Sequence, residues 1–308
     1  MQTVSMKTGD HIKTTAELSQ LGISASTIYR RVERGRLIKL RHGVYVDAAI
    51  WNGFSIFQRC YAHHVAVAKS HPRSVLSHES AAMMYDISLL NLPDKVHISS
   101  ATYGIKSREN LRVHGCSSDV LERTWWIEDA RVTSPLDTLI DCAKFLPHRD
   151  AVCIADQFLH RGLVDRVAVQ SSILGLRGPG ALRVGRVVER MSAHAESVAE
   201  TLVRVLLYDW NLEMPIEQGE VLTSAGARYR PDFIWEHLRL ILEVDGEVKY
   251  SGKYGKPEDV IRAEHRRQRE LERDGWKIIR VRWGEITKSP WTLRQELMKS
   301  GVKVRQTS

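Results

Sequence analysis

The sequence predicts a multidomain protein that combines α+β and α/β architecture, and three observations carry this prediction. Its 308 residues correspond to two domains at ~150 residues each, or to three if one is small. Short helical patterns and a basic hairpin fill about 10–50, and helical and strand-like segments then alternate as far as about 195. After the Gly/Pro cluster at 175–180, a helix precedes strand-like runs, a very basic helix and a last strand. We expect domains at residues 1–54, 55–195 and 196–308.

The composition excludes several classes of protein and indicates a polyanionic partner. With 43% hydrophobic and 27% charged residues, the chain is neither collagen-like, low-complexity nor wholly disordered. Lys and Arg (45) outnumber Asp and Glu (37), and the net charge of +8 favours attraction to nucleic acid. The four cysteines are widely spaced, which predicts reduced thiols. No apolar signal segment or membrane-spanning run of ~20 residues is present, so we expect a cytoplasmic protein with no membrane partner. The composition does not determine the oligomeric state.

The sequence of the first region predicts two short helices followed by a hairpin. Each helix follows a hydroxyl residue that can cap it and ends near a glycine, Gly22 or Gly35. Two helices joined by a tight glycine-containing turn form a helix-turn-helix, and the runs 37–40 and 44–46 then flank a basic turn. The region is therefore predicted to be a winged helix. The candidate caps are Thr14 or Thr15 for the first helix and Ser24 or Ser26 for the second.

Basic and hydroxyl side chains gather in the two elements with which a winged helix binds double-stranded DNA. Residues near the start of the second helix could meet base edges, whereas its arginines could bind guanine or phosphates. Basic residues of the hairpin would add phosphate contacts. The alternatives are a solvated surface or a winged helix that binds protein. The candidates are Ser26, Thr27, Arg30, Arg31 and Arg34 in the second helix, and Arg36, Lys39 and Arg41 in the hairpin.

The run Leu37-Ile-Lys-Leu-Arg-His-Gly-Val-Tyr45 resembles the N-terminal winged helix of the AbiEi family of abortive-infection antitoxins. The similarity continues through 75–82, 96–98 and 131–141. This resemblance implies sequence-specific DNA binding, repression of the protein's own operon, and a cognate toxin or other protein as a partner.

The histidines of the middle region do not suggest a metal site from their spacing. His63, His64 and His78 are candidate ligands, but adjacent histidines on a helix point to different faces. No third ligand stands at a suitable spacing. We therefore expect core or surface histidines.

The last region contains acidic residues that a hairpin would bring together. The runs 229–235 and 240–250 alternate as strands do, and 236–239 separates them as a short turn. A hairpin centred between His237 and Leu238 places Asp232 directly opposite Glu243, where like charges repel. Asp245 falls on the same face, as does Lys249 if the strand stays regular. Bound Mg²⁺ or Mn²⁺ would resolve the repulsion.

A further carboxylate could come from the preceding helix. Glu200 lies at the margin of the apolar arc of that helix, where it could reach the hairpin. It also ends a Ser-x-x-Glu capping box begun by Ser197, and the two roles are compatible. The arginine-rich helix at 258–274 suits a phosphodiester substrate, but its arginines are also explained as partners of nearby glutamates. We assign none of them a catalytic role.

This order of helix, hairpin, basic helix and strand resembles the PD-(D/E)XK nuclease superfamily, and in particular its very-short-patch-repair (Vsr)-like branch. The resemblance covers about 196–290 and rests on Pro231-Asp232, Glu243-Val-Asp-Gly246 and Lys249-Tyr250. It implies a restriction-endonuclease-like fold in which Asp232 and Glu243 bind metal and Glu200 is the acidic residue of the helix. Asp245 stands in the place of the usual lysine, for which Lys249 is the candidate replacement.

The two modules together predict a DNA-binding protein with a metal-dependent endonuclease domain. Its catalytic residues would be Asp232, Glu243, Asp245, Lys249 and Glu200, and the four carboxylates would bind Mg²⁺ or Mn²⁺. The alternative is a non-enzymatic repressor or antitoxin with an inactive nuclease fold, which the absent lysine favours.

Overall fold

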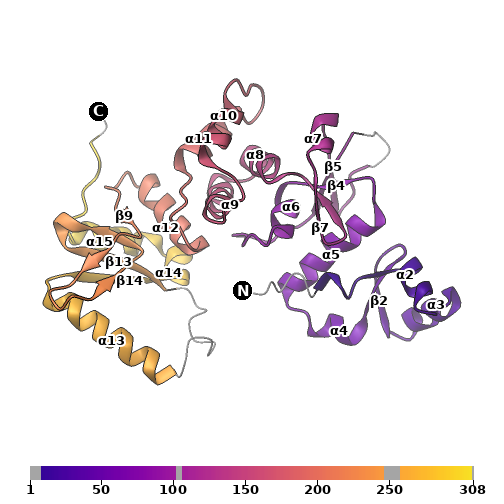
Figure 1. Cartoon of the computed structure of the whole chain (residues 1–308), viewed down its shortest axis with the longest axis horizontal. Coiled ribbons are helices and arrows are strands. Elements are labelled where there is room, and N and C mark those ends of the chain that lie inside the picture. The colour runs from indigo at the N-terminus through magenta and orange to yellow at the C-terminus, as the bar shows by residue number, and fades with distance from the viewer. Residues whose placement is uncertain (1–7, 102–105, 246–256, 307–308) are drawn as a thin grey trace. The chain divides into compact units, whose positions relative to one another are not determined.

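The structure, a computed structural model, describes residues 8–101, 106–245 and 257–306 (Figure 1). It divides into two compact units, residues 1–189 and 190–308. Helices and strands alternate along the described residues, and the strands form four β-sheets. This confirms the mixed α/β class. The division into three domains stays a prediction. No helix within the described ranges combines the length and apolarity needed to cross a bilayer.

The N-terminal part of the first unit contains the expected pair of helices and the hairpin. Thr14 caps the first helix in a capping box with Glu17, and the Ser24 hydroxyl caps the second by accepting from the N–H of Thr27. Gly43 has φ 73° in the hairpin turn, a conformation that glycine adopts without steric cost. The elements are β1 (Lys13–Thr14), α2 (Thr15–Gln20), α3 (Ala25–Glu33), β2 (Leu37–Arg41) and β3 (Val44–Asp47), with the sheet order β1-β3-β2.

A small apolar core holds these elements together. Leu18 of α2, Ile28 of α3 and Leu37 of β2 are buried against one another, and Tyr45 of β3 packs against them. The α3 helix contributes one buried residue to this core, and most of its other residues face solvent. The α3 helix is thus anchored on one side and open on the other.

The rest of the first unit is a mixed sheet with helices packed against it (Figure 1). The sheet order is β6-β5-β4-β8-β7, with β5 parallel to β6 and β4 parallel to β8. Its strands are β4 (Val75–Leu76), β5 (Val96–Ser100), β6 (Leu111–Gly115), β7 (Trp125–Ile127) and β8 (Ala130–Val132). The helices are α4 (Ala48–Gly53), α5 (Ile56–Ser70), α6 (His78–Met84), α7 (Ser118–Glu122), α8 (Pro135–Phe145), α9 (His148–His160), α10 (Arg166–Ile173) and α11 (Ala181–Arg190).

The second unit has a four-stranded sheet in the order β14-β13-β12-β9. β13 and β14 are parallel, and α13 makes the crossover that such a pair requires. The strands are β9 (Ile216–Glu217), β12 (Phe233–Trp235), β13 (Leu240–Asp245) and β14 (Lys277–Arg282), and β10 (Val221–Leu222) pairs separately with β11 (Arg228–Tyr229). The helices are α12 (Val198–Asp209), α13 (Pro257–Arg273), α14 (Trp283–Lys288) and α15 (Pro290–Lys299), and a 3-10 turn spans Glu236–Leu238.

The register of the β12–β13 hairpin is the predicted one. Ile234 pairs with Ile241, so the turn is centred between residues 237 and 238. The prediction of one continuous strand over 229–235 is wrong, because β11 ends at Tyr229 and β12 begins at Phe233. Pro231 lies between them and has no N–H with which to continue a ladder. Ile234 and Ile241 pack against Leu271, so α13 covers the face that these two isoleucines share.

Candidate nucleic-acid interface and acidic cluster

The α3 helix exposes three of the four predicted DNA contacts that lie on it. Ser26, Arg30 and Arg31 are exposed, and Thr27 is half-buried. The Arg30 guanidinium donates a 3.2 Å hydrogen bond to the Thr27 hydroxyl, which holds both side chains near the start of the helix. The predicted contacts that follow are exposed at Arg34, Arg36 and Lys39 and half-buried at Arg41.

The exposed cations of this surface have no acidic partners in the described part of the chain. None of the ion pairs there includes Arg30, Arg31 or Arg34, and the same holds for Arg36 and Lys39. Solvated surface arginines commonly pair with glutamates on the same helix. Five unpaired cations on adjacent elements instead suit a polyanion, because each can neutralise a phosphate.

Tyr29 is a residue of this surface that the sequence analysis did not single out. It lies on α3 with 67% of its surface exposed, three residues after Ser26 and beside Arg30. Helical spacing of three and four places these side chains on one face. The signal was available in the sequence, since an aromatic residue on the polar face of a helix is unusual in a small domain.

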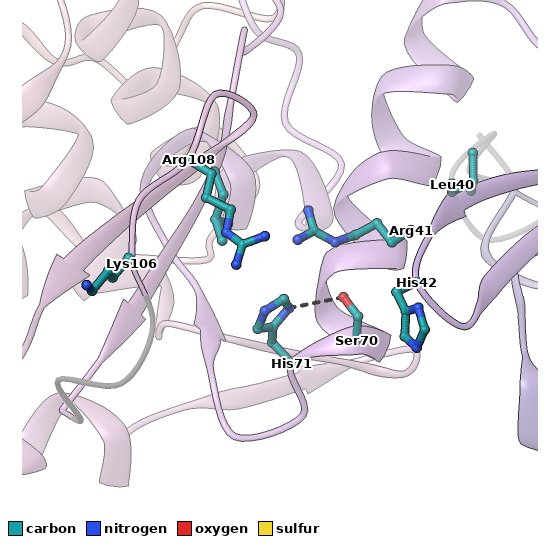
Figure 2. A pocket seen from close by; sticks show the side chains of 8 residues that line it. Leu40, Arg41, His42, Ser70, His71, Lys106 and Arg108 are labelled. Carbon is teal, nitrogen blue, oxygen red and sulfur yellow. Dashed lines mark hydrogen bonds between the residues drawn. The ribbon is translucent and has the colours of Figure 1, made fainter.

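A basic pocket of about 580 Å³ lies beside the hairpin (Figure 2). Arg41 from the end of β2 and Arg108 from the segment before β6 direct their guanidinium groups toward one another, with His71 below them (Figure 2). Lys106 and His42 line the same pocket. Of these residues, only Arg41 was predicted as a DNA contact, because residues 42, 71, 106 and 108 come together only in the folded unit.

Like charges repel inside this pocket. Burial lowers the pKa of Arg41, and the charge of Arg108 lowers it further. Burial also lowers the pKa of His71, with added contributions from Arg41 and Arg108. An anion held between the two guanidinium groups would remove this repulsion, and arginine binds phosphate in bidentate fashion. The pocket therefore suits a phosphate group.

In the second unit, Asp232 lies at the start of β12 and joins the two strands of the hairpin. Its Oδ2 accepts a 2.7 Å hydrogen bond from the backbone N–H of Val244, and its Oδ1 accepts one of 3.3 Å from Gln218. Asp232 is half-buried, and each of its carboxylate oxygens has a hydrogen-bond donor.

Glu243 of β13 is buried and paired with two arginines. Arg267 of α13 donates to its Oε1, and the Nε of Arg280 on β14 lies 3.3 Å from its Oε2. Arg280 also donates to Gln268 at 3.1 Å. The repulsion expected between Glu243 and Asp232 is thus compensated by guanidinium groups. An ion bound to Glu243 would have to share or displace them.

Glu200 lies in the first turn of α12, where the Ser197 hydroxyl caps the helix; the predicted capping box is incomplete, because the carboxylate accepts from the N–H of Glu196 rather than from that of Ser197. The Glu200 N–H donates to the Ser197 hydroxyl at 3.1 Å, and its carboxylate accepts from that hydroxyl at 2.7 Å and from the N–H of Glu196 at 2.9 Å. The Gln218 amide donates to Glu200 at 3.0 Å and to Asp232 at 3.3 Å. One amide group therefore bridges the helix carboxylate and the hairpin carboxylate.

The other two predicted catalytic residues are less closely connected to this cluster. Asp245 is half-buried at the end of β13, opposite Arg282 in the register with β14. Lys249 lies outside the described residues. Within the described ranges, no three of the carboxylates bring one oxygen each within 4.8 Å of one another. In this arrangement, amide and guanidinium groups donate to three of the predicted metal ligands, Asp232, Glu243 and Glu200.

The first unit brings together three histidines of the middle region, of which His78 and His97 are buried and His114 is half-buried. His78, His97 and His114 each place one ring nitrogen within 4.8 Å of the others. The fold therefore brings together three imidazoles whose sequence spacing does not indicate a common site. Burial lowers the pKa of all three, to about 2 for His78 and to about 4 for His97 and His114. Their imidazoles are consequently neutral at physiological pH.

Comparison with known proteins bears on the N-terminal region and on the chain as a whole. The chain is 22% identical over 270 residues to the uncharacterized proteins MT2308 and Rv2248 of two Mycobacterium tuberculosis strains, and the alignments cover 87% of this chain and 94% of each relative. The crystal structure of the RV2827C protein from the same species is similar with a TM-score of 0.40 and 16% identity, over 71% of this chain and 86% of that one. Residues 14–46 match the family described as "Transcriptional regulator, AbiEi antitoxin".

Proposed function

We propose that this protein is a DNA-binding transcriptional regulator of the antitoxin type. The unpaired cations of α3 and β2 carry the proposal, since they occupy the two elements with which a winged helix binds DNA. The match of residues 14–46 to AbiEi antitoxin regulators supports it. We further propose that the DNA is double-stranded and includes the promoter of the protein's own operon, and that a cognate toxin is a partner.

In the proposed complex, α3 enters the major groove. Ser26, Tyr29 and Arg30 form the exposed face at the start of the helix and would read base edges. A bidentate arginine–guanine contact discriminates against a wrong base by about 1–3 kcal/mol. Arg36 and Lys39 would bind phosphates and contribute little to sequence preference. We place a further phosphate in the pocket between Arg41 and Arg108.

The test is the affinity of the full-length protein for a labelled fragment of its own promoter, measured by fluorescence anisotropy. Arg30→Ala/Arg31→Ala removes one predicted base contact and one predicted phosphate contact, and we expect binding to weaken at least tenfold. Arg177→Ala/Arg186→Ala is the matched control. It removes the same charge from exposed positions of the same unit, outside α3 and the hairpin.

The outcomes distinguish specific from general electrostatic binding. Unchanged affinity of the Arg30/Arg31 variant would contradict the proposed interface. An equal loss in the control variant would show that net charge, and not α3, determines the affinity. An unrelated fragment of the same length should bind more weakly than the promoter, because phosphate contacts alone are insensitive to sequence.

Metal-dependent phosphodiester hydrolysis by residues 190–308 is the second candidate function. The register that aligns Asp232 with Glu243, and the Gln218 amide that joins Asp232 to Glu200, favour it. Arg267 and Arg280 weigh against it, because they engage both oxygens of Glu243. The carboxylates in this arrangement do not fit a bare Mg²⁺ or Mn²⁺ ion, so we derive no hydrolytic step. Cleavage of DNA with either metal, lost in Asp232→Asn, would establish this activity.

A further inference from the structure

His78, His97 and His114 come from three elements of the first unit and meet on one face of its sheet. His97 of β5 and His114 of β6 lie on neighbouring parallel strands, where His114 pairs with Ser99. Alternation places residues 97 and 99 on the same face, so both imidazoles project to the same side. His78, the first residue of α6, stacks on His114 with a centroid distance of 3.8 Å.

Two of the nitrogen atoms are spaced nearly as the ligands of a small cation are. His97 Nδ1 lies 3.0 Å from His114 Nε2. With Zn–N bonds of ~2.0–2.1 Å, two nitrogens of a tetrahedral site lie about 3.4 Å apart, close to this separation. Two neutral imidazoles could instead share one N–H···N bond. The third imidazole within 4.8 Å distinguishes the cluster from a simple pair.

A carboxylate lies near a ring nitrogen of two of the imidazoles. Glu79 Oε2 lies 3.5 Å from His97 Nε2, and Asp141 Oδ2 lies 3.8 Å from His78 Nδ1. At His97 the carboxylate faces Nε2, which leaves Nδ1 for the centre of the cluster, whereas His78 Nδ1 also lies 3.0 Å from the Ser77 hydroxyl. Metal-binding histidines characteristically donate their second N–H to such a carboxylate, which orients the ring.

The surroundings enclose the cluster on one side. Phe145 of α8 presents its ring edge-on to all three imidazoles at centroid distances of 5.2–5.6 Å. His97 and His78 are buried, whereas His114 is half-buried. A cation held here would have the Phe145 ring on one side and would be accessible from the side of His114.

The backbone of His78 supplies an independent observation. Its φ of 54° lies in the left-handed region, which non-glycine residues rarely adopt. Such residues gather at binding and active sites, where the surrounding structure holds them in place. The conformation occurs at the residue that brings α6 to the two strand histidines.

We propose that His78, His97 and His114 bind one Zn²⁺ ion, with the fourth coordination position open to water or to an exogenous ligand. Three imidazoles with second-layer carboxylates match the donor preference of zinc, and the Phe145 ring contacts all three imidazoles. The site lies in the first unit and shares no residue with α3 or with the predicted acidic cluster. It is independent of the proposed DNA binding.

The experiment uses full-length protein freed of metal with a chelator. Zinc content after reconstitution and dialysis is measured by elemental analysis, and affinity by competition with a chromophoric chelator. Co²⁺ serves as a spectroscopic probe, since tetrahedral coordination gives intense visible absorption. We expect one zinc per chain and a tetrahedral Co²⁺ spectrum that Zn²⁺ abolishes.

Two variants and a control locate the site. His114→Gln removes the half-buried ligand, and we expect zinc affinity to fall more than 100-fold. Glu79→Gln keeps all three ligands, so we expect the Co²⁺ spectrum to persist with affinity reduced 10–100-fold. His63→Gln, at an exposed histidine outside the cluster, should bind zinc as the wild type does.

Either of two results would overturn the proposal. One is wild-type protein that retains no zinc and gives no tetrahedral Co²⁺ spectrum. The other is His114→Gln protein that binds zinc with unchanged affinity. If His114→Gln fails to fold, the Glu79→Gln variant decides, because unchanged affinity there contradicts the assigned geometry.

Discussion

The Asp232 carboxylate accepts a 2.7 Å hydrogen bond from the backbone N–H of Val244, the residue after Glu243. Asp232 therefore stabilises the hairpin as well as being a candidate metal ligand. An alanine substitution at this position would disturb both roles, so activity measurements need the isosteric Asp232→Asn variant.

Asp232→Ala should destabilise the hairpin of the second unit. Removing a hydrogen bond to a charged acceptor costs about 1.5–3 kcal/mol, and the Val244 N–H would lose its partner. Asp232→Asn keeps an acceptor oxygen and should cost less. Hydrogen exchange of the Val244 amide measures both effects. Equal protection in wild-type and Asp232→Ala protein would contradict the structural role.

The buried ion pair between Arg204 and Glu217 should matter far more than a surface pair. Their side chains are 2% and 18% exposed, and the Arg204 Nε lies 3.2 Å from Glu217 Oε2. Glu217→Ala would remove the carboxylate from a buried guanidinium that keeps its hydrogen bond to the Arg190 carbonyl, and breaking a buried pair in this way costs about 3–5 kcal/mol. We expect this loss in urea denaturation followed by tryptophan fluorescence.

The control for that experiment is Glu220→Ala. Glu220 pairs with Arg228 at 3.5 Å, but both side chains are at least two-thirds exposed. Such pairs contribute about 0–1 kcal/mol. If the two variants lose the same stability, burial is not what gives the Arg204 pair its effect.

Glu17 should contribute to stability at neutral pH but not in strong acid. Burial raises its pKa, but hydrogen bonds from Lys69 and Thr14 and the Lys69 charge outweigh burial and lower it from 4.5 to about 2. A depressed carboxyl pKa stabilises the fold above the unfolded value, and this contribution disappears as pH falls through the folded value. The destabilisation by Glu17→Gln should therefore be constant above about pH 5 and vanish near pH 2.

Thermal unfolding of both proteins across this pH range measures the difference. Glu33→Gln is the control, because Glu33 is exposed at the end of α3 and forms no ion pair with the described residues. A difference between wild-type and Glu17→Gln protein that grew toward low pH would have the wrong sign and would refute the assignment.

The pocket between Arg41 and Arg108 should contribute to the salt dependence of DNA binding. Each neutralised phosphate contributes ~0.9 to the slope of log K against log salt concentration. If both arginines neutralise phosphates, Arg41→Gln/Arg108→Gln should reduce that slope by about two, with little change in sequence preference. Arg177→Gln/Arg186→Gln should leave it unchanged. A wild-type slope in the pocket variant would exclude phosphate from this pocket.

Features set by neighbouring residues could be predicted from the sequence. Ser24 caps α3 and Ser197 caps α12, because a cap needs only residues within one helical turn. The β12–β13 register could also be predicted, since a short turn defines which residues face each other. The break at Pro231 was missed, although the absent proline N–H was evidence against a continuous strand.

The sequence by itself therefore determined the helix-turn-helix and hairpin with their exposed cations, and the opposition of Asp232 to Glu243. Tertiary structure alone decided what surrounds these groups. Arg267 and Arg280 approach Glu243 from α13 and β14, and His78 joins residues 97 and 114 from a separate helix. Local patterns specify backbone periodicity, whereas contacts between residues far apart in the chain depend on how the elements pack. The charge balance around each candidate site is consequently a property of the packed fold.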